Sequence, residues 1–348
     1  MGVNWIMGCI TGSCLAILVN GTPFDFFTVS RGLRQGCPLS PLLFILIMEG
    51  LSRIILNAQH SGKIKGFKFS PNLSLSHLFF VDDVILIGAG TIDEWRAYKE
   101  ALDLFCGVSG MSVNPIKSSF LYQNVDSRFR EELAVLFPFK MDPITMGFKY
   151  LGFNLKPLGY HTSDWTWLIQ LFERKIHNWT YRYLSLGSRV ILIRAVLTGL
   201  AVYWFALERC PKSILNTLHK IIYSFLWGSS AGHCYSHIVS WETLSLPIEF
   251  GGWDIKNLEW FGISLRLKSL WHLLTGTRTS SRIIALKYLK NKPLDVWIRG
   301  RSFSIVGTSY FLNGFIRIIE WITCQLGWKV GNGLKIRVGI DPIAGLNS

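Results

Sequence analysis

The chain has 348 residues, and its 36 Lys and Arg against 22 Asp and Glu give a formal net charge of +14. Hydrophobic residues make up 49% of the chain and aromatic residues 14%, while only 17% are charged. This composition excludes an intrinsically disordered chain, and 7 cysteines are too few, and odd in number, for a disulfide scaffold. The length predicts about two or three domains.

The positive charge lies mostly in the second half of the chain. Residues 1–160 hold 14 basic and 12 acidic residues, a net of +2, whereas residues 161–348 hold 22 basic and 10 acidic residues, a net of +12. Of the 14 tryptophans, 12 follow residue 160. A basic, Trp-rich half favours a polyanion as partner, although a soluble domain with a high pI would carry the same charge.

One window, Val190–Leu207, is apolar enough to suggest a membrane span. Arg194 lies inside it, and a charge at the centre of a spanning helix costs about 2.5–3.5 kcal/mol. The apolar spacing also fits an amphipathic helix of a soluble protein, so we expect no membrane partner. Because no Lys or Arg precedes Arg31, the N-terminus lacks the basic region of a signal peptide. We therefore expect an intracellular protein, with nucleus or cytoplasm left open.

The first predicted elements are a hairpin and a helix. The apolar runs Cys14–Val19 and Phe24–Val29 flank Asn20-Gly21, a strong hairpin signal because both turn residues tolerate positive φ. Ser40 is then predicted to cap a helix that begins at Pro41 and runs to about Asn57. This helix is apolar on nearly every side, so we expect it to be buried.

A second hairpin follows, with the runs Leu75–Phe80 and Val84–Ile87 joined by Val81-Asp82-Asp83. Thr91 and Glu94 have the spacing of a capping box for a helix through about Phe105, which Gly107 and Gly110 are predicted to end. A strand near 119–122 and a short element near 150–152 complete this part, which is typical of an α+β fold.

Beyond residue 160 the apolar spacing becomes helical. One predicted stripe contains Leu168, Leu171, Phe172, Ile176, Trp179 and Tyr183, and a later one contains Leu215, Leu218, Ile221, Ile222 and Phe225. Trp179 and Trp204 fall on such stripes, which favours core packing over stacking on nucleic-acid bases. The pattern weakens past Gly228.

Asp82 and Asp83 are the chemically informative pair of the chain. Adjacent carboxylates repel, and a divalent cation offsets that repulsion. Mg²⁺ favours such oxygen ligands together with substrate phosphates, and two ions can clamp an in-line phosphoryl displacement. A solvated Asp-Asp turn is the plain alternative, because Asp is a common turn residue.

Several motifs in order resemble one family, the reverse transcriptases of plant LINE-type (non-LTR) retrotransposons. Phe80-Val81-Asp82-Asp83 resembles its aromatic-x-Asp-Asp box, and the segment from Arg31 to Pro41 resembles its template- and nucleotide-contacting loop. Ser109–Asn114 with Lys117 is similar to the next motif, and Tyr150-Leu151-Gly152 is similar to the segment that grips the primer. The resemblance continues through a thumb-like region that contains Tyr183–Arg189, Ile193 and Phe225–Gly228, then through Trp241, Pro247 and Gly251-Gly252 to Val330–Gly333 and Asp341-Pro342.

The resemblance implies an RNA-directed DNA polymerase that acts by two-metal phosphoryl transfer on an RNA template, a DNA primer and a dNTP. Asp82 and Asp83 would be catalytic and would hold Mg²⁺ or Mn²⁺. Template and nucleotide would contact Arg31, Gly32, Arg34, Gln35, Gly36 and Lys117, and the primer would contact Tyr150, Leu151 and Gly152. Arg174, Lys175 and Arg182 are weaker candidates for phosphate contacts, since solvated surface explains each of them equally well.

The implied fold is α+β, a partial right hand with a palm at 1–156, a helical thumb at 157–230 and a connection-like extension at 231–348. In the family, a third catalytic aspartate lies well upstream of the Arg31–Pro41 loop. Before Asp82 this chain has only two acidic residues, Asp25 and Glu49, and neither is a credible replacement. We therefore expect an N-terminally truncated and inactive polymerase. A non-catalytic nucleic-acid-binding remnant remains the alternative.

Overall fold

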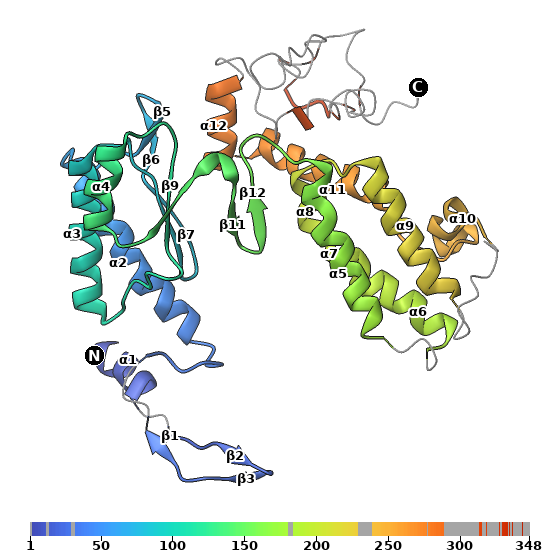
Figure 1. Cartoon of the computed structure of the whole chain (residues 1–348), viewed down its shortest axis with the longest axis horizontal. Helices are drawn as coiled ribbons and strands as arrows, with labels where there is room; N and C mark the ends of the chain where they lie inside the picture. The colour runs from blue at the N-terminus through green and yellow to red at the C-terminus, as the bar shows by residue number, and fades with distance from the viewer. Residues whose placement is uncertain are drawn as a thin grey trace. The chain divides into compact units, whose positions relative to one another are not determined.

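The structure is a computed structural model that describes residues 2–11, 14–28, 32–179, 184–228, 239–276 and 278–288, with a few short stretches between 313 and 343. The chain divides into two compact units, residues 1–142 and 143–348. The first unit mixes helices and strands, and the second is mainly helical in its described part (Figure 1). The prediction of a mixed helix-and-strand protein is therefore confirmed.

The first unit opens with helix α1 (Gly2–Thr11) and the predicted hairpin. Its short strands are β1 (Cys14–Leu15), β2 (Leu18–Val19), β3 (Thr22–Pro23) and β4 (Phe27–Thr28), where β2 pairs with β3 and β1 with β4. Asn20 and Gly21 both have positive φ, 50° and 84°, as a type I′ turn requires.

Helix α2 (Ser40–His60) corrects two expectations. The N-cap residue is Leu39, and the Ser40 hydroxyl donates instead to the carbonyl of Arg34 at 2.7 Å. The fully buried residues of the helix, Met48, Leu51 and Ile55, lie in its middle and second half. In the first half Phe44 packs half-buried against the core, while Leu42, Ile45 and Leu46 are 62–64% exposed. An apolar sequence predicts burial only where another element packs on the helix, and the sequence pattern does not show whether such an element is present.

Helix α2 packs on α3 (Ile92–Ser109), and α3 packs on α4 (Ser127–Leu136). Between α2 and α3 the chain forms the hairpins β5–β6 (Phe67–Ser70 and Leu73–Leu75) and β7–β8 (His77–Phe80 and Asp83–Leu86). Phe79, Val84 and Leu86 of the second hairpin pack against the helical core, which includes Leu51, Ile55, Tyr98, Ala101 and Leu133. The helices thus support the hairpin that carries Asp82 and Asp83.

The predicted capping box of α3 is wrong. Thr91 is the N-cap residue, but no side chain caps the helix, because the Glu94 carboxylate turns into the unit and is only 1% exposed. There it accepts backbone N–H groups of Lys65, Gly66 and Ala89 at 2.6–2.8 Å. The helix ends at Gly110, which has φ 70° as a C-cap glycine should, while Gly107 lies inside it.

Beyond α3 the unit contains β9 (Ser119–Tyr122), which confirms the predicted strand and pairs with β10 (Lys140–Pro143). The second unit begins with the 3₁₀ turn η1 (Ile144–Met146) and the hairpin β11–β12 (Phe148–Tyr150 and Phe153–Leu155). The contact-based boundary at 142/143 lies 14 residues before the end of the palm expected from the resemblance, 156. The expected domain limits stay a prediction.

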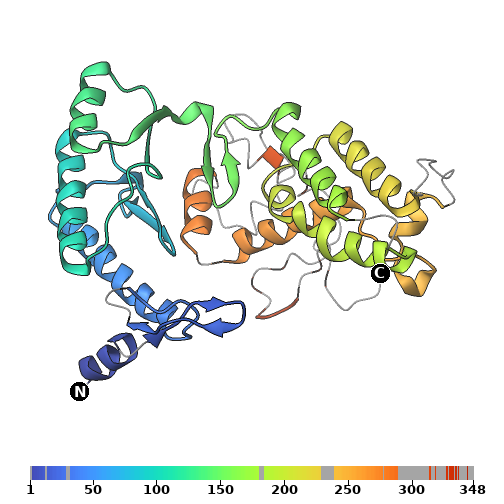
Figure 2. The same cartoon turned by 60° about the horizontal axis from the view of Figure 1, so that its bottom comes forward.

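The rest of the second unit is helical. In chain order the elements are η2 (Thr162–Trp165), α5 (Thr166–His177), α6 (Leu186–Leu192), the π-helical η4 (Ile193–Leu197), α7 (Thr198–Leu200), α8 (Val202–Leu207), α9 (Lys212–Trp227), α10 (Trp241–Ser245), η5 (Ile248–Phe250), α11 (Leu258–Thr275) and α12 (Thr279–Tyr288). Helix α5 packs on α9, α9 on α6, and α11 on α8 (Figure 2). Figure 2 shows these helices turned by 60° from the view of Figure 1.

The helical stripes predicted from the sequence form the core of this bundle. Leu168, Phe172 and Ile176 of α5 are buried, as are Leu215, Leu218, Ile222 and Phe225 of α9. Leu171, Ile221 and Trp179 pack against them half-buried, while Tyr183 lies outside the described residues. Trp204 is 4% exposed, and the half-buried Trp179 ring lies 5.1 Å from that of Phe225, so core packing is confirmed for the two predicted tryptophans.

Residues 190–207 form the predicted amphipathic helix, interrupted by its π-helical turn, with Ile193, Leu197, Ala201 and Trp204 buried and Arg194 exposed. Among the described residues, a different helix, α2, is long and apolar enough to cross a membrane by length and composition. The core helices of soluble proteins meet the same criterion, and the second half of α2 lies in such a core.

Candidate functional site

Asp82 and Asp83 lie at the tip of the β7–β8 hairpin, and both are exposed. Phe80 pairs with Asp83, which leaves Val81 and Asp82 as the two turn residues. Val81 has φ 55°, a conformation that is an outlier for a β-branched side chain and costs about 1–3 kcal/mol. A strained backbone residue, Val81, therefore lies directly beside the two carboxylates.

The base of this hairpin is tied to α3. The hydroxyl of Tyr98 lies 2.9 Å from the carbonyl oxygen of Ser76, which precedes β7, and 2.8 Å from that of Ile87, which follows β8. Burial, and then the nearby Glu94 carboxylate, raise the pKa of Tyr98 far above its usual range. The hydroxyl consequently stays protonated and can donate across the accessible pH range.

His77 ties β7 to α2. Its Nε2 lies 2.9 Å from the Ser52 hydroxyl and its Nδ1 lies 3.0 Å from the Ser76 hydroxyl. Burial lowers the pKa of His77, and the carboxylate of Glu49 offsets part of this effect. The ring is therefore neutral at pH 7, and it fixes the strand that leads to the carboxylates.

The loop before α2 is built from two successive turns. Gly36 has φ 84°, and Cys37 N–H donates to the Arg34 carbonyl at 3.4 Å, which is the type II arrangement with glycine at its third position. Ser40 N–H then donates to the Cys37 carbonyl at 3.1 Å. Gly32, Arg34, Gln35 and Gly36 are all exposed on this loop, and Arg31 lies outside the described residues.

Lys117 lies on an exposed turn that follows α3. The Asn114 carboxamide oxygen accepts the backbone N–H groups of Ile116 and Lys117 at 3.0 and 3.2 Å, and Ser118 N–H donates to the Asn114 carbonyl. Asn114 thus shapes the turn that presents Lys117. Among the described residues, no hydrogen bond or ion pair joins Lys117, the 32–36 loop and the Asp82–Asp83 turn to one another.

Tyr150, Leu151 and Gly152 form the tip of the β11–β12 hairpin. Leu151 and Gly152 both have positive φ, 47° and 81°, and Tyr150 pairs with Phe153, so the sequence signal corresponds to a tight hairpin turn. Phe153 packs its ring 5.4 Å from Trp204 and 5.6 Å from Tyr203. The hairpin is therefore attached to the helical bundle of the second unit.

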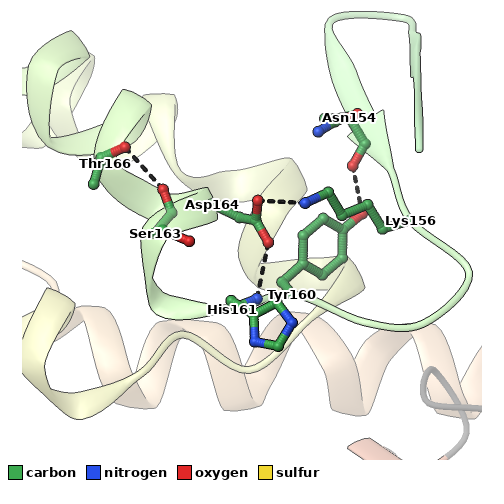
Figure 3. Close-up of polar contacts among 7 residues, drawn as sticks. All are labelled: Asn154, Lys156, Tyr160, His161, Ser163, Asp164 and Thr166. Atoms are coloured by element: carbon green, nitrogen blue, oxygen red, sulfur yellow. Dashed lines mark hydrogen bonds and ion pairs between the residues drawn. The ribbon is translucent and has the colours of Figure 1, made fainter. Parts of the chain in front are cut away.

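A polar cluster joins the end of this hairpin to η2, the turn that precedes α5. Lys156, just after β12, forms an ion pair with Asp164 at 2.5 Å, and Asp164 also accepts the His161 backbone N–H at 2.8 Å (Figure 3). Tyr160 donates its hydroxyl to the Asn154 carbonyl at 2.7 Å. Burial alone would raise the pKa of Asp164, but the Lys156 and His161 hydrogen bonds outweigh it and hold that pKa below its usual value.

Arg174 and Lys175 are exposed in the last turn of α5. Cations at this end of a helix also interact favourably with the helix dipole, so their position fits a surface role and a phosphate-contact role equally. Arg182 lies outside the described residues.

Sequence reasoning missed the role of Arg189. Its guanidinium donates to the carbonyls of Leu226 and Gly228 at 3.2 and 2.7 Å, where it caps the last turn of α9. Two segments that are far apart in the chain, α6 and the end of α9, are thus joined through one side chain. The signal was present in the sequence, since both segments resemble the same region of the family, but only the fold brings them together.

The donor chemistry at Asp82 and Asp83 suits Mg²⁺, which proteins commonly hold with one or two carboxylates plus substrate phosphates. Within the described ranges, no group of three or more Asp, Glu, His or Cys side chains could hold a metal ion. Glu49 is paired with Arg53 at 2.7 Å, and Asp25 is exposed on the N-terminal hairpin. The described residues therefore provide two carboxylates and no third ligand.

Comparison with known proteins finds similarity to reverse transcriptases. Residues 1–155 match the family model described as reverse transcriptase (RNA-dependent DNA polymerase). An uncharacterized mitochondrial protein of Arabidopsis thaliana is 49% identical over 70 residues, which cover 20% of this chain and 57% of that protein. A Pol polyprotein from a type-2 retrotransposable element of Drosophila melanogaster is 24% identical over 304 residues, or 81% of this chain and 26% of the relative.

A Pol polyprotein from a type-1 retrotransposable element of Popillia japonica is 27% identical over 185 residues, covering 47% of this chain and 28% of the relative. The chain thus spans between 26% and 57% of the length of these three curated relatives. The matched region contains the 32–36 loop, the Asp82–Asp83 hairpin and Lys117. Residues 1–155 of this chain therefore match a reverse transcriptase domain, and its relatives include Pol polyproteins of retrotransposable elements.

Proposed function

We propose that the chain acts on an RNA template and a DNA primer as the polymerase region of a non-LTR retrotransposon protein. The observation that carries this proposal is the strained Val81–Asp82 turn, which Tyr98 and His77 hold on the helical core of a domain matching reverse transcriptases. Such a turn displays both carboxylates in solvent, where phosphates and a metal ion can reach them.

In this proposal, Asp82 and Asp83 hold Mg²⁺, which lowers the barrier to phosphoryl transfer by neutralising charge on the phosphates. The 32–36 loop, together with Arg31, contacts template and nucleotide, and Lys117 contacts the triphosphate. The tip at 150–152 contacts the primer. These roles assign palm function to the first unit and thumb function to the helical bundle, with Arg174, Lys175 and Arg182 as contacts to the nucleic-acid backbone. Its substrates place the protein inside the cell.

The two carboxylates of the described residues make a weak metal site by themselves, so we propose that the isolated chain does not extend a primer. It should still bind Mn²⁺ once template, primer and dNTP supply further oxygen ligands. Electron paramagnetic resonance of free Mn²⁺ measures this directly, in mixtures with poly-rA/oligo-dT and dTTP. Asp82→Asn with Asp83→Asn should abolish the extra Mn²⁺ binding that the chain adds to poly-rA/oligo-dT and dTTP alone, while Asp25→Asn, a change at another exposed carboxylate, should leave that increment unchanged.

Primer extension by the same preparations separates the outcomes. Extension by the purified chain that Asp82→Ala abolishes would overturn the proposed inactivity and leave the polymerase assignment standing. Salt-sensitive binding of template–primer with no Mn²⁺ dependence on Asp82 and Asp83 would instead favour the alternative, a non-catalytic nucleic-acid-binding remnant. Absence of binding to template–primer at low salt would refute both.

A further inference from the structure

A small cavity on the helical bundle of the second unit is lined by residues that have no role in the assignments above. It has a volume of about 360 Å³ and is lined by Ile191, Arg194, Ala195, Asp254 and Lys256. The volume falls within the range of small-molecule pockets, roughly 300–1,000 Å³. The cavity is therefore larger than a single ion requires.

One wall of the cavity is irregular helix. Arg194 and Ala195 belong to the π-helical turn η4 (Ile193–Leu197), which interrupts an otherwise α-helical run. Single π-helical turns are rare and occur frequently at functional sites. In this turn Ile193 and Leu197 stay in the core while Arg194 is exposed, so the irregularity places a guanidinium at the cavity.

The cavity is also lined by a short segment outside the helices, residues 254–256, which is held by backbone hydrogen bonds. Ile255 is 1% exposed, and its N–H donates to the Leu244 carbonyl at 3.2 Å, while Asp254 N–H donates to the Leu246 carbonyl at 2.9 Å. Asp254 has φ 51°, a left-handed conformation that is uncommon outside glycine. The segment therefore presents Asp254 and Lys256 from a fixed backbone.

The charges in the cavity favour an anion. Asp254 accepts a hydrogen bond from Nη2 of Arg194 at 2.5 Å, across 60 residues of sequence. A guanidinium has five N–H donors, so the pair orients Arg194 and leaves donors for a ligand. The Lys256 ammonium lies 4.7 Å from the centre of the Phe261 ring. Two cations against one carboxylate leave a net positive charge, which excludes a metal-cation site.

We propose that Arg194 and Lys256 bind a backbone phosphate of a nucleic-acid strand, with Asp254 positioning the guanidinium and Ile191 and Ala195 facing the sugar. Planar guanidinium groups match phosphate oxygens in pairs, and the surrounding half of the chain is strongly basic, with 22 basic against 10 acidic residues in 161–348. The proposal rests on the proposed function in one respect, since it takes nucleic acid as the ligand.

The test is fluorescence anisotropy of a labelled RNA–DNA template–primer, titrated with the full chain at 50 to 300 mM KCl. Arg194→Gln and Lys256→Gln should each weaken binding about 3- to 10-fold and lower the slope of log affinity against log salt by about 1. Arg96→Gln is the matched control, because it removes the same charge from an exposed Arg–Asp pair, Arg96–Asp93 at 2.8 Å on α3. That variant should bind within about twofold of the wild type.

Circular dichroism of each variant checks that the bundle remains folded. Lys256→Gln keeps the test valid if Arg194→Gln unfolds, since Lys256 forms no ion pair with any other described residue. Equal affinities for the cavity variants and the Arg96→Gln control, in a chain that binds template–primer, would overturn this site while sparing the proposed function. A free nucleotide offers the same phosphate chemistry. Loss of dTTP binding with unchanged template–primer binding would therefore also overturn the proposal.

Discussion

Removal of the Tyr98 hydroxyl should loosen the hairpin that carries Asp82 and Asp83. In Tyr98→Phe, the Ser76 carbonyl still accepts the Ile87 N–H at 2.8 Å, whereas the Ile87 carbonyl loses the hydroxyl that lies 2.8 Å away. Tyr98 is fully buried, so water cannot replace the hydroxyl without rearrangement. Leaving one buried acceptor unsatisfied costs about 1–3 kcal/mol.

Hydrogen–deuterium exchange measures this cost locally. Since about 1.4 kcal/mol changes an equilibrium tenfold, amides of β7 and β8 should exchange about 5- to 100-fold faster in Tyr98→Phe. The matched control is Tyr223→Phe, which removes a hydroxyl that donates to the Val239 carbonyl at 3.0 Å in the second unit. Unchanged exchange of the β7–β8 amides in Tyr98→Phe, or the same acceleration in the control, would refute the role assigned to this hydroxyl.

Three further changes have expected outcomes. Val81→Gly should raise the free energy of unfolding by about 1 kcal/mol in urea melts, because glycine adopts the φ of 55° without strain; a loss of stability would count against that strain. Gly252→Ala should cost about 3 kcal/mol or more, since its new Cβ would lie 2.0 Å from the Leu246 carbonyl oxygen, and an unchanged melting temperature would contradict this. Burial lowers the pKa of His77, so its contribution to stability is complete above pH 6.5 and declines as the pH falls below that value. Urea melts of His77→Gln should therefore lose less stability than the wild type between pH 7 and pH 5, and parallel pH profiles would argue against a neutral, buried ring.

Local sequence signals predicted the hairpins and helices well. Asn20-Gly21 gave the right turn because positive φ at both residues is a local property, and the α5 and α9 stripes gave the right buried faces because their 3.6-residue period repeats over several turns. The carboxylate hairpin was also located by its flanking β-prone runs.

Predictions that depended on tertiary partners were less successful. Glu94 has capping-box spacing, yet three backbone N–H groups of other segments bind its carboxylate. Ser40 was displaced from the cap position by the turn that follows Arg34. The link between Arg189 and the end of α9, and the cavity at Arg194, required the three-dimensional structure, because their residues are separated by 37 to 60 positions.

The exposed first half of α2 has a consequence for the protein in the cell. Leu42, Ile45 and Leu46 together present a run of large apolar side chains to water, and contiguous patches of this kind promote association. Chaperones and proteases continuously sort proteins according to the apolar surface and unfolded chain they present. Covering this half-helix should therefore lengthen the lifetime of the protein more than it changes any step of its chemistry.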